Sequence, residues 1–234
     1  MNVDRRTSIA AIVLAHPACA GVFQDRRIDF CCSGEVSVPQ ACAARGLDPE
    51  AVFLALDAAS AGEPKAQDVA PREMDTPALV AFIVERHHAY LRVSLPHLVP
   101  LATKVAQVHG DHDPRLRELQ AVFADLREAI DIHLEHEEEE LFREATAPAP
   151  DRDALSRKVP GMLVEHRELG AALQRIRDLA DDFAPPRWAC TSYRMLLTGL
   201  RALEDDLVAH IHLENYVLLP RFASVNLGMV RAVS

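Results

Sequence analysis

The chain has 234 residues, of which 49% are hydrophobic and 26% charged, and it carries a formal net charge of −10 at pH 7. This composition is that of a globular protein with a sizeable core, and the acidic balance argues against nucleic acid or an anionic membrane surface as a partner. No stretch reaches the roughly 20 apolar residues of a membrane-spanning helix. Frequent Ala, Leu, Glu and Arg predict an all-α fold.

The first 23 residues combine a basic start, an apolar run and a small-residue end, a pattern also found in secretory signal peptides. His16 and Pro17 interrupt this run before Ala18-Cys19-Ala20. We therefore predict a short amphipathic helix that ends at Pro17 rather than a leader.

The five cysteines are odd in number and fit no disulfide framework, which favours a reducing compartment. Cys31 and Cys32 are adjacent, so a disulfide between them would be strained. On the glycine-containing turn Asp29–Gly34, they form either a reactive thiol site or metal ligand, or two small apolar fillers. The cysteines that we expect to be buried structural residues are Cys19, Cys42 and Cys190.

The chain divides into two predicted domains and a linker. Residues 1–60 form a small helical domain with the Cys-Cys motif, including one or two short helices within residues 36–59. Residues 61–76 are rich in Gly, Pro and charge and form the linker. Residues 77–225 form the second domain.

Prolines and polar turns divide the second domain into four helices. The first begins at Thr76-Pro77, and Pro96 and Pro100 are expected to kink or split it. The others are expected at about residues 114–144, from near residue 160, and at about residues 187–222. Short connections between four helices predict an up-down-up-down bundle.

Two of these helices carry His and Glu on their apolar stripe. The second has apolar residues at helical spacing that lead to His133 and Glu137, and the fourth has the same arrangement at His210 and Glu214. Burying an imidazole and a carboxylate costs several kcal/mol unless they find a partner. Spacing of four residues puts each pair on one side of its helix, where the usual partner is a metal ion.

The first and third helices each place one histidine on the stripe, His88 and His166. His87 lies one position off the stripe and is the less probable inward residue. Nearly equal spacing from His88 to His133 and from His166 to His210 reveals an internal repeat. The six candidate metal ligands are His88, His133, Glu137, His166, His210 and Glu214.

Four imidazoles and two carboxylates are too many ligands for one tetrahedral zinc and suit two ions bridged by the carboxylates. Nitrogen and oxygen ligands without thiolate favour iron or manganese, and an open redox-active site favours iron; manganese and zinc remain less favoured alternatives. Ferritin-type sites use the reverse order, Glu-x-x-His, and more carboxylates.

With these residues the chain resembles the hemerythrin-like di-iron bundles. Over nearly its full length it resembles the iron–sulfur cluster repair di-iron proteins, also called repair-of-iron-centres proteins, which join a Cys-Cys domain to such a bundle. Further matching stretches are Asp29–Gly34, Leu95-Pro96, Ala102–Val105 with Val108-His109, Val164–His166, Pro185-Pro186 with Ala189–Thr191, and His210–Asn215.

The resemblance implies a cytoplasmic stress-response protein that restores iron–sulfur clusters damaged by nitric oxide or peroxide, by iron donation or nitric oxide chemistry. It assigns the six residues above as ligands of two non-haem irons, with Glu137 and Glu214 bridging, and Cys31 and Cys32 as candidates for thiol exchange. Expected partners are damaged iron–sulfur proteins and NO or O2, with neither nucleic acid nor membrane; a second copy of the chain is a further candidate.

Three departures from the family pattern leave all six ligands in place. Ser33 replaces the first of two glycines that usually follow the cysteine pair, and Leu91 stands where relatives can carry a second histidine. His136 is additional, because the repeat has Leu213 at the equivalent position.

Two alternative functions compete with cluster repair: binding of O2 or NO, and a purely structural role. A hemerythrin-type O2 or NO carrier or sensor would have no need of the Cys-Cys domain. A purely structural bundle does not account for the doubled ligand pattern. The residues do not decide whether the protein is an enzyme with turnover.

Overall fold

The computed structural model describes residues 4–61 and 70–223. Within these ranges the secondary structure is helical, with one isolated bridge between Ser8 and Ser37, so the predicted all-α class is confirmed. The chain forms two compact units, one of Thr76–His210 and one of Met1–Asp75 together with Ile211–Ser234. None of the described helices is both long and apolar enough to cross a membrane.

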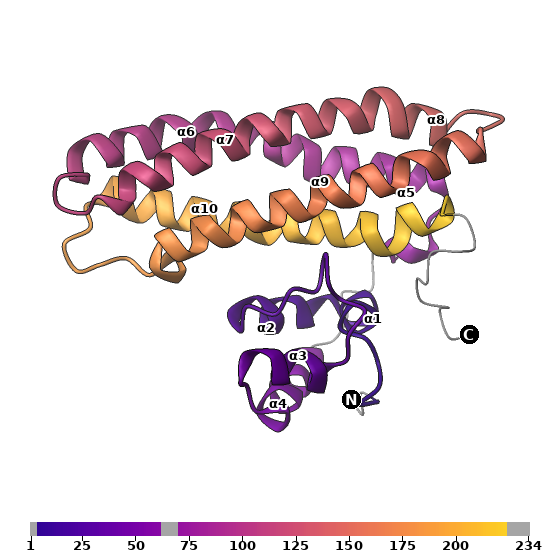
Figure 1. The fold of residues 1–234 in the computed structure, drawn as a ribbon, viewed down its shortest axis with the longest axis horizontal. Helices are drawn as coiled ribbons and strands as arrows, with labels where there is room; N and C mark the ends of the chain where they lie inside the picture. Colours follow the sequence, from indigo (N-terminus) through magenta and orange to yellow (C-terminus); the bar gives the residue numbers. More distant parts are fainter. Residues whose placement is uncertain (1–3, 62–69, 224–234) are drawn as a thin grey trace. The chain divides into compact units, whose positions relative to one another are not determined.

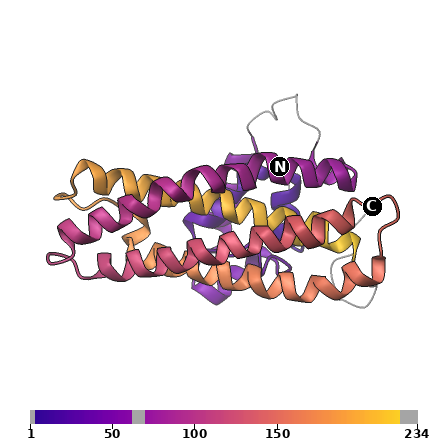
Figure 2. The ribbon, with the colours of Figure 1, turned by 90° about the horizontal axis from the view of Figure 1, so that it is seen from above.

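Thr76–His210 contains a bundle in which four long helical segments lie side by side (Figures 1 and 2). Their apolar stripes form its core, as the spacing predicted: Leu119, Phe123 and Ile130 are each at most 1% exposed. The main helices are α5 (Thr76–Ile83), α6 (Ala89–His109), α7 (Arg115–His136), α9 (Arg152–Leu179) and α10 (Thr191–Leu213).

Prolines interrupt these helices less than predicted. α6 runs through both Pro96 and Pro100, so of the predicted kink or split the split is excluded and the kink stays a prediction. α9 begins at Arg152, where the Asp151 side chain caps its N-terminus, and it also runs through Pro160, where we had predicted its start. All three prolines lie on exposed faces, where water can bond the carbonyls that lack an N–H partner.

Three π-helical turns interrupt the regular α-helical geometry instead. They are η3 (Val84–His88), η4 (Glu137–Phe142) and η6 (Glu214–Leu218). After η4 and η6 the chain continues in α8 (Arg143–Ala145) and in η7 (Leu219–Arg221) respectively. Each π turn begins or ends at a candidate ligand, and π turns are frequent at functional sites.

The unit that contains the N-terminal residues is built from short helices around a small core that includes Phe23, Phe30 and Leu56. The first helix ends at Ala15, before Pro17, as predicted. A capping box at Ser37 and Gln40 begins α3. The helices are α1 (Ile9–Ala15), η1 (Pro17–Cys19), α2 (Ala20–Asp25), α3 (Val38–Arg45), α4 (Pro49–Ser60) and η2 (Pro71–Glu73).

The predicted domain boundaries, 1–60, 61–76 and 77–225, stay a prediction. Half of the linker, residues 62–69, and residue 225 lie outside the described residues. The described residues do reveal a feature that the sequence did not suggest: the chain from Ile211 onward groups with the N-terminal residues, although it continues helix α10.

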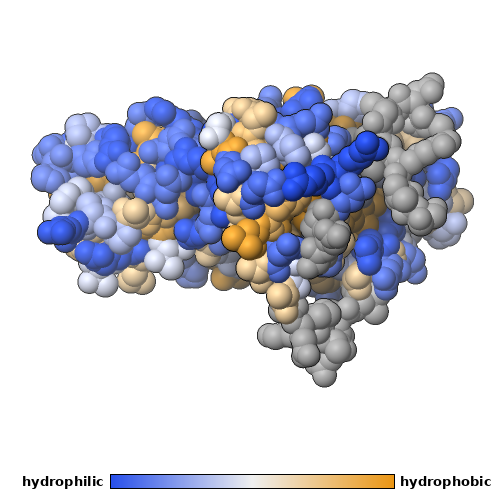
Figure 3. Space-filling model, turned by 90° about the horizontal axis from the view of Figure 1, so that it is seen from below, coloured by the Kyte–Doolittle hydropathy of each residue, from blue (hydrophilic) through white to orange (hydrophobic). Residues whose placement is uncertain are grey.

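Polar side chains dominate the visible face of the molecule in Figure 3, with smaller hydrophobic areas between them. This distribution agrees with a chain in which charged residues make up 26%. Polar side chains on such a surface are ordinary, whereas buried polar side chains are rare. The buried polar residues of the bundle are therefore the better indication of a metal site.

Candidate metal centre

The bundle brings the six predicted ligands together in two groups. One group is His88, Glu137, His210 and Glu214, and the other is His133, Glu137, His166 and Glu214. Within each group the ligand atoms lie within 4.8 Å of one another. Both groups share the two carboxylates, which is the arrangement expected of two cations bridged by Glu137 and Glu214. All six side chains are at most 2% exposed.

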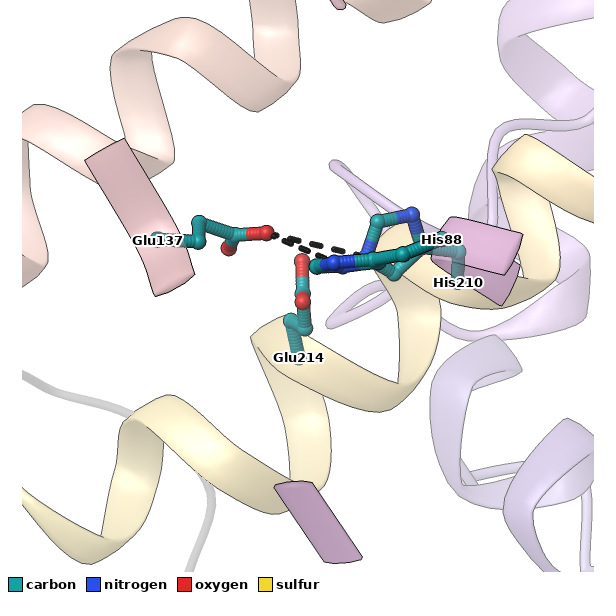
Figure 4. Close-up of side chains that lie close together, drawn as sticks. All are labelled: His88, Glu137, His210 and Glu214. Carbon is teal, nitrogen blue, oxygen red and sulfur yellow. Dashed lines mark hydrogen bonds and ion pairs between the residues drawn. The ribbon is translucent and has the colours of Figure 1, made fainter. Parts of the chain in front are cut away.

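Glu137 lies at the centre of the cluster. Its Oε2 is 3.4 Å from His88 Nε2, 3.6 Å from His133 Nε2 and 3.8 Å from His210 Nε2. Its Oε1 is 3.9 Å from His166 Nε2. Figure 4 shows His88, Glu137, His210 and Glu214 pointing toward one another from three segments of the chain. Four imidazoles thus direct the same ring nitrogen, Nε2, toward one carboxylate.

Two of the π turns begin at the shared carboxylates and change the inward face of the chain after them. Glu137 is the first residue of η4, four residues after His133, and Glu214 is the first residue of η6, four residues after His210. A π turn adds one residue to a helical turn, so it shifts the inward face of everything that follows. Each His–Glu pair keeps α-helical spacing, while Leu141 and Phe142 both turn inward after Glu137.

Carboxylates outside the cluster fix the orientation of two ligand rings. His88 Nδ1 is 2.6 Å from Glu138 Oε1, and His133 Nδ1 is 2.8 Å from Glu165 Oε2. An Nδ1–H donated to a carboxylate leaves the Nε2 lone pair for a metal, which is the usual support of a histidine ligand. Burial raises the pKa of Glu138, but hydrogen bonds from Arg92 and His88 outweigh it and lower that pKa overall.

The sequence pattern gave no means of finding these supporting carboxylates. Glu138 belongs to the run Glu137–Glu140, whose members resemble one another in sequence while only Glu137 is buried completely. Glu165 directly precedes His166, yet it supports His133 on another helix. Tertiary packing of α7 against α9, and of η4 against η3, selects these residues.

Helical spacing placed two further histidines, His136 and His87, outside the ligand set. His136 has a side chain that is 53% exposed and lies outside both donor groups, as its absence from the repeat predicted. His87 was ranked below His88 as the inward residue, yet both are buried, since His87 is only 3% exposed. The π turn η3 contains both His87 and His88, and its wider turn places both side chains inside.

The Cys31–Cys32 turn is organised by Asp29. Asp29 Oδ1 accepts hydrogen bonds from the backbone N–H groups of Cys31 (3.0 Å) and Cys32 (2.9 Å). The Cys31 thiol lies 3.5 Å from that of Cys32 and 3.3 Å from Asp29 Oδ1, with no disulfide. The contact with Cys32 and burial raise the pKa of Cys31 well above its usual value. Cys31 is therefore a protonated thiol at neutral pH, and Cys32 is the more exposed of the two.

Residues on either side of Glu214 hold this turn, and all of them belong to the same compact unit as the turn. His212 Nδ1 donates to the Phe30 carbonyl (3.2 Å), and Asn215 Nδ2 donates to the Cys31 carbonyl (2.7 Å). Tyr216 Oη accepts from the Gly34 N–H (2.8 Å). Burial lowers the pKa of His212 to about 4, against the effect of its hydrogen bond, so this histidine is neutral.

Gly34 is required by this packing. A Cβ at this position would lie 2.4 Å from the Phe30 carbonyl oxygen and 2.8 Å from Ala10 Cβ, which is closer than real contacts allow. Of the two glycines that usually follow the cysteine pair, this chain replaces the first by Ser33 and keeps the second, Gly34. Gly34 is the position at which the packing of the turn leaves no room for a side chain.

The other cysteines separate into two classes. Cys19 and Cys42 are fully buried, as expected. Cys190 is exposed, so the expectation that it is buried was wrong. It lies in the connection directly before α10, where its sulfur is 3.2 Å from His109 Nε2 rather than in the core.

The donor set fits iron. It offers six nitrogen and oxygen ligands and no thiolate, which suits iron or manganese better than the thiolate-rich sites of structural zinc. Two carboxylates buried together also need positive charge nearby, because an uncompensated buried anion costs several kcal/mol. Two divalent cations between Glu137 and Glu214 would supply that charge.

Fold and site together define a helical bundle built to bind cations. Residues 80–222 match the family described as "Hemerythrin HHE cation binding domain", and residues 5–60 match "Domain of Unknown function (DUF542)". The iron–sulfur cluster repair protein YtfE of Yersinia pseudotuberculosis is 33% identical over 220 residues, 93% of this chain and 96% of that protein. The repair protein ScdA of Staphylococcus haemolyticus is 29% identical over 223 residues, 94% of this chain and 100% of that protein.

The chain belongs to the hemerythrin HHE family, and within it to the iron–sulfur cluster repair proteins. The likeness covers both the segment with the Cys-Cys turn and the bundle. The resemblance inferred from the sequence is thereby confirmed.

Proposed function

We propose that this protein holds two irons in the bundle and restores iron–sulfur clusters damaged by nitric oxide or oxidative stress. The observation that carries the proposal is the pair of buried donor groups that share Glu137 and Glu214. The relatives named for cluster repair match this chain over nearly its whole length, including the Cys-Cys turn, which favours repair over an O2 carrier or sensor.

The six donor residues would hold the iron, with His88 and His210 on one side, His133 and His166 on the other, and the two glutamates between. Bound iron would supply redox chemistry and affinity for nitric oxide. The protein's part is to keep the histidine rings oriented through the carboxylates of Glu138 and Glu165, and to exclude bulk water from a cluster that is at most 2% exposed.

The Cys31–Cys32 turn is the proposed route by which iron or a bound ligand is exchanged with a client protein. Its two sulfurs and an Asp29 oxygen lie within 4.8 Å of one another, so they offer a small set of mixed soft and hard donors. A cation bound there would displace the thiol protons. Since Cys31 is buried with a raised pKa, the more exposed Cys32 would be the first to meet a partner. None of the five cysteines forms a disulfide, which suits a reducing compartment such as the cytoplasm.

The metal assignment is tested by purifying the chain anaerobically and measuring iron content together with its visible and Mössbauer spectra. We expect about two irons per chain, because six ligands serve two bridged ions. Recovery of one tetrahedral zinc as the native metal would overturn the di-iron assignment.

The repair role is tested in cells that lack their own repair protein, by following the recovery of an iron–sulfur enzyme after nitric oxide exposure. The double variant Cys31→Ser, Cys32→Ser should keep the iron content and spectrum and lose recovery. Cys190→Ser, which removes an exposed thiol elsewhere, is the matched control and should recover normally. Full recovery by a double variant with a normal thermal transition would remove the cysteines from the mechanism.

A further inference from the structure

His87 forms a buried pair that the proposed metal centre does not use. Its Nδ1 is 2.9 Å from Asp206 Oδ1, and its side chain is 4% exposed, against 18% for Asp206. The edge of the Phe82 ring packs against it, with centroids 6.1 Å apart. The carboxylate therefore fixes an imidazole in a defined orientation inside the bundle.

The ring held by Asp206 lies against a candidate ligand. His87 and His210 are parallel within 7°, with ring centroids 5.5 Å apart, which is an offset stack. Asp206 and His210 are four residues apart on α10, so they lie on one side of that helix, and His87 approaches both from η3. Asp206, His87 and His210 thus form a continuous row.

His210 is held by a different kind of contact from the one that holds His88 and His133. Glu138 and Glu165 hold His88 and His133 in the plane of the ring, through Nδ1. His87 contacts His210 across its face and so restricts rotation of the His210 ring about its Cβ–Cγ bond. His210 Nε2 lies 3.1 Å from His88 Nε2, so a small rotation would change both distance and direction toward a shared cation.

We infer that His87, fixed by Asp206, is a positioning residue for His210 and sets the geometry of the metal bound between His88 and His210. This inference rests on the proposed iron centre. It makes the two irons unequal, because only the His88 and His210 side includes the stacked pair.

The test is Mössbauer spectroscopy of 57Fe-loaded full-length protein, combined with iron release to a chelator. In Asp206→Asn, one of the two iron signals should change its quadrupole splitting while the other stays as in wild type. One of two irons should also leave faster, by roughly tenfold or more, as for other losses of a partner that orients a metal ligand. Asp205→Asn, an exposed acidic neighbour on the same helix, should match wild type in both measurements.

Substitutions of His87 separate the stack from the hydrogen bond. His87→Phe keeps an aromatic face against His210 and should release iron more slowly than His87→Leu, which has none. A pair that only stabilises helix packing would lower the unfolding midpoint and leave both iron signals and release rates unchanged. That result in Asp206→Asn would overturn the inference even if the His87 variants do not fold. Wild-type protein without two irons would overturn the iron centre itself, and this role with it.

Discussion

The bundle buries carboxylates in two different ways. Arg177 and Glu204, which are 4% and 5% exposed, form a closed pair in which Arg177 Nε donates to both carboxylate oxygens at 2.9 and 3.1 Å. The hydrogen bond and charge of Glu204 raise the pKa of Arg177 further, against the effect of burial. At the metal centre, Glu137 and Glu214 are surrounded by imidazoles instead.

The comparison shows why the buried carboxylates at the metal centre indicate a bound cation and the Arg177–Glu204 pair does not. A guanidinium neutralises a carboxylate and fills its geometry with paired donors, so the Arg177–Glu204 pair is complete within the protein. An imidazole neutralises a carboxylate only when protonated, and it then loses the lone pair that a metal would need. Histidines that keep this lone pair leave the negative charge of two carboxylates for a cation to balance.

The largest expected effect is the loss of metal from Glu137→Ala or Glu214→Ala. Each removes a carboxylate shared by both donor groups, so we expect the iron content to fall from about two per chain to near zero. Removal of iron from wild type should lower its free energy of unfolding by about 4 kcal/mol if iron was present at a thousandfold excess over its dissociation constant. Metal analysis and thermal unfolding with and without a chelator measure both effects.

Two neighbouring residues serve as controls for that loss. His136→Ala and Glu139→Ala change exposed side chains outside the donor groups and should keep both irons. Iron retention by Glu137→Ala, or iron loss by His136→Ala, would contradict the assignment of the bridging carboxylates.

Substitutions in the Arg177–Glu204 ion pair should lower stability without changing the iron content. Glu204→Gln removes the buried anion and leaves Arg177 with only the more exposed carboxylate of Asp182, so unfolding should become easier by about 3–5 kcal/mol while iron content stays normal. The double variant Arg177→Met, Glu204→Leu removes both charges and should recover most of the stability. Denaturant unfolding and metal analysis of the same preparations separate the two kinds of buried charge. Loss of iron in folded Glu204→Gln would show that the pair and the metal centre are not independent.

A neutral buried group, Asn215, should show a smaller effect. Its side chain donates to the Cys31 carbonyl, so Asn215→Leu leaves a buried acceptor short of a donor and should cost about 1–3 kcal/mol. Loosening of the turn should also speed alkylation of Cys31, measured in a Cys32→Ser background. Tyr216→Phe removes the hydroxyl that accepts from Gly34 and donates to Glu35, and because both hydrogen bonds are at least partly exposed it should have a weaker effect of the same kind. Equal labelling rates in all three chains would mean that these side chains do not hold the turn.

The six donors and the bundle could be predicted because helical periodicity alone defines an inward face. His133 and Glu137 occupy positions where Ile130 and Leu126 set the stripe, and the repeat does the same for the second pair. Nothing in that reasoning depends on how the helices pack. The expected cluster of all six side chains then follows from the bundle topology.

The remaining features depend on packing, which periodicity does not contain. An α-helical projection puts His87 off the stripe, but the π turn η3 brings it inside. Asp206 lies beside similar acidic residues in sequence and is singled out only by its contact with His87. The contacts of Asn215 join residues far apart in the chain, on segments that we had assigned to separate domains.

The smallest effect is expected at a surface pair, the half-buried Asp113 and the exposed Arg115. The Arg115 side chain donates to Asp113 at 3.0 and 2.8 Å, and this hydrogen bonding, opposed by burial, lowers the pKa of Asp113 below its usual 3.8. The Arg115 side chain is 48% exposed, so solvent and salt screen the interaction. Asp113→Asn keeps an oxygen for the backbone N–H of Arg115, but it removes the charge and one of the two oxygens that accept from the Arg115 side chain.

A lowered pKa in the folded state means that the unfolded chain binds more protons at acid pH. The stabilisation is therefore fully present above the unfolded pKa, near 3.8, and is lost as the pH falls through the lower folded value. We expect Asp113→Asn to cost about 0.5–1 kcal/mol at pH 7 and low salt, and nothing near pH 2. Asp111→Asn, at a side chain that is 95% exposed, is the control and should change the free energy of unfolding less than Asp113→Asn at pH 7. A cost for Asp113→Asn that is unchanged between pH 7 and pH 2, or insensitive to 1 M salt, would mean that the side chain acts through packing of the turn rather than through its charge.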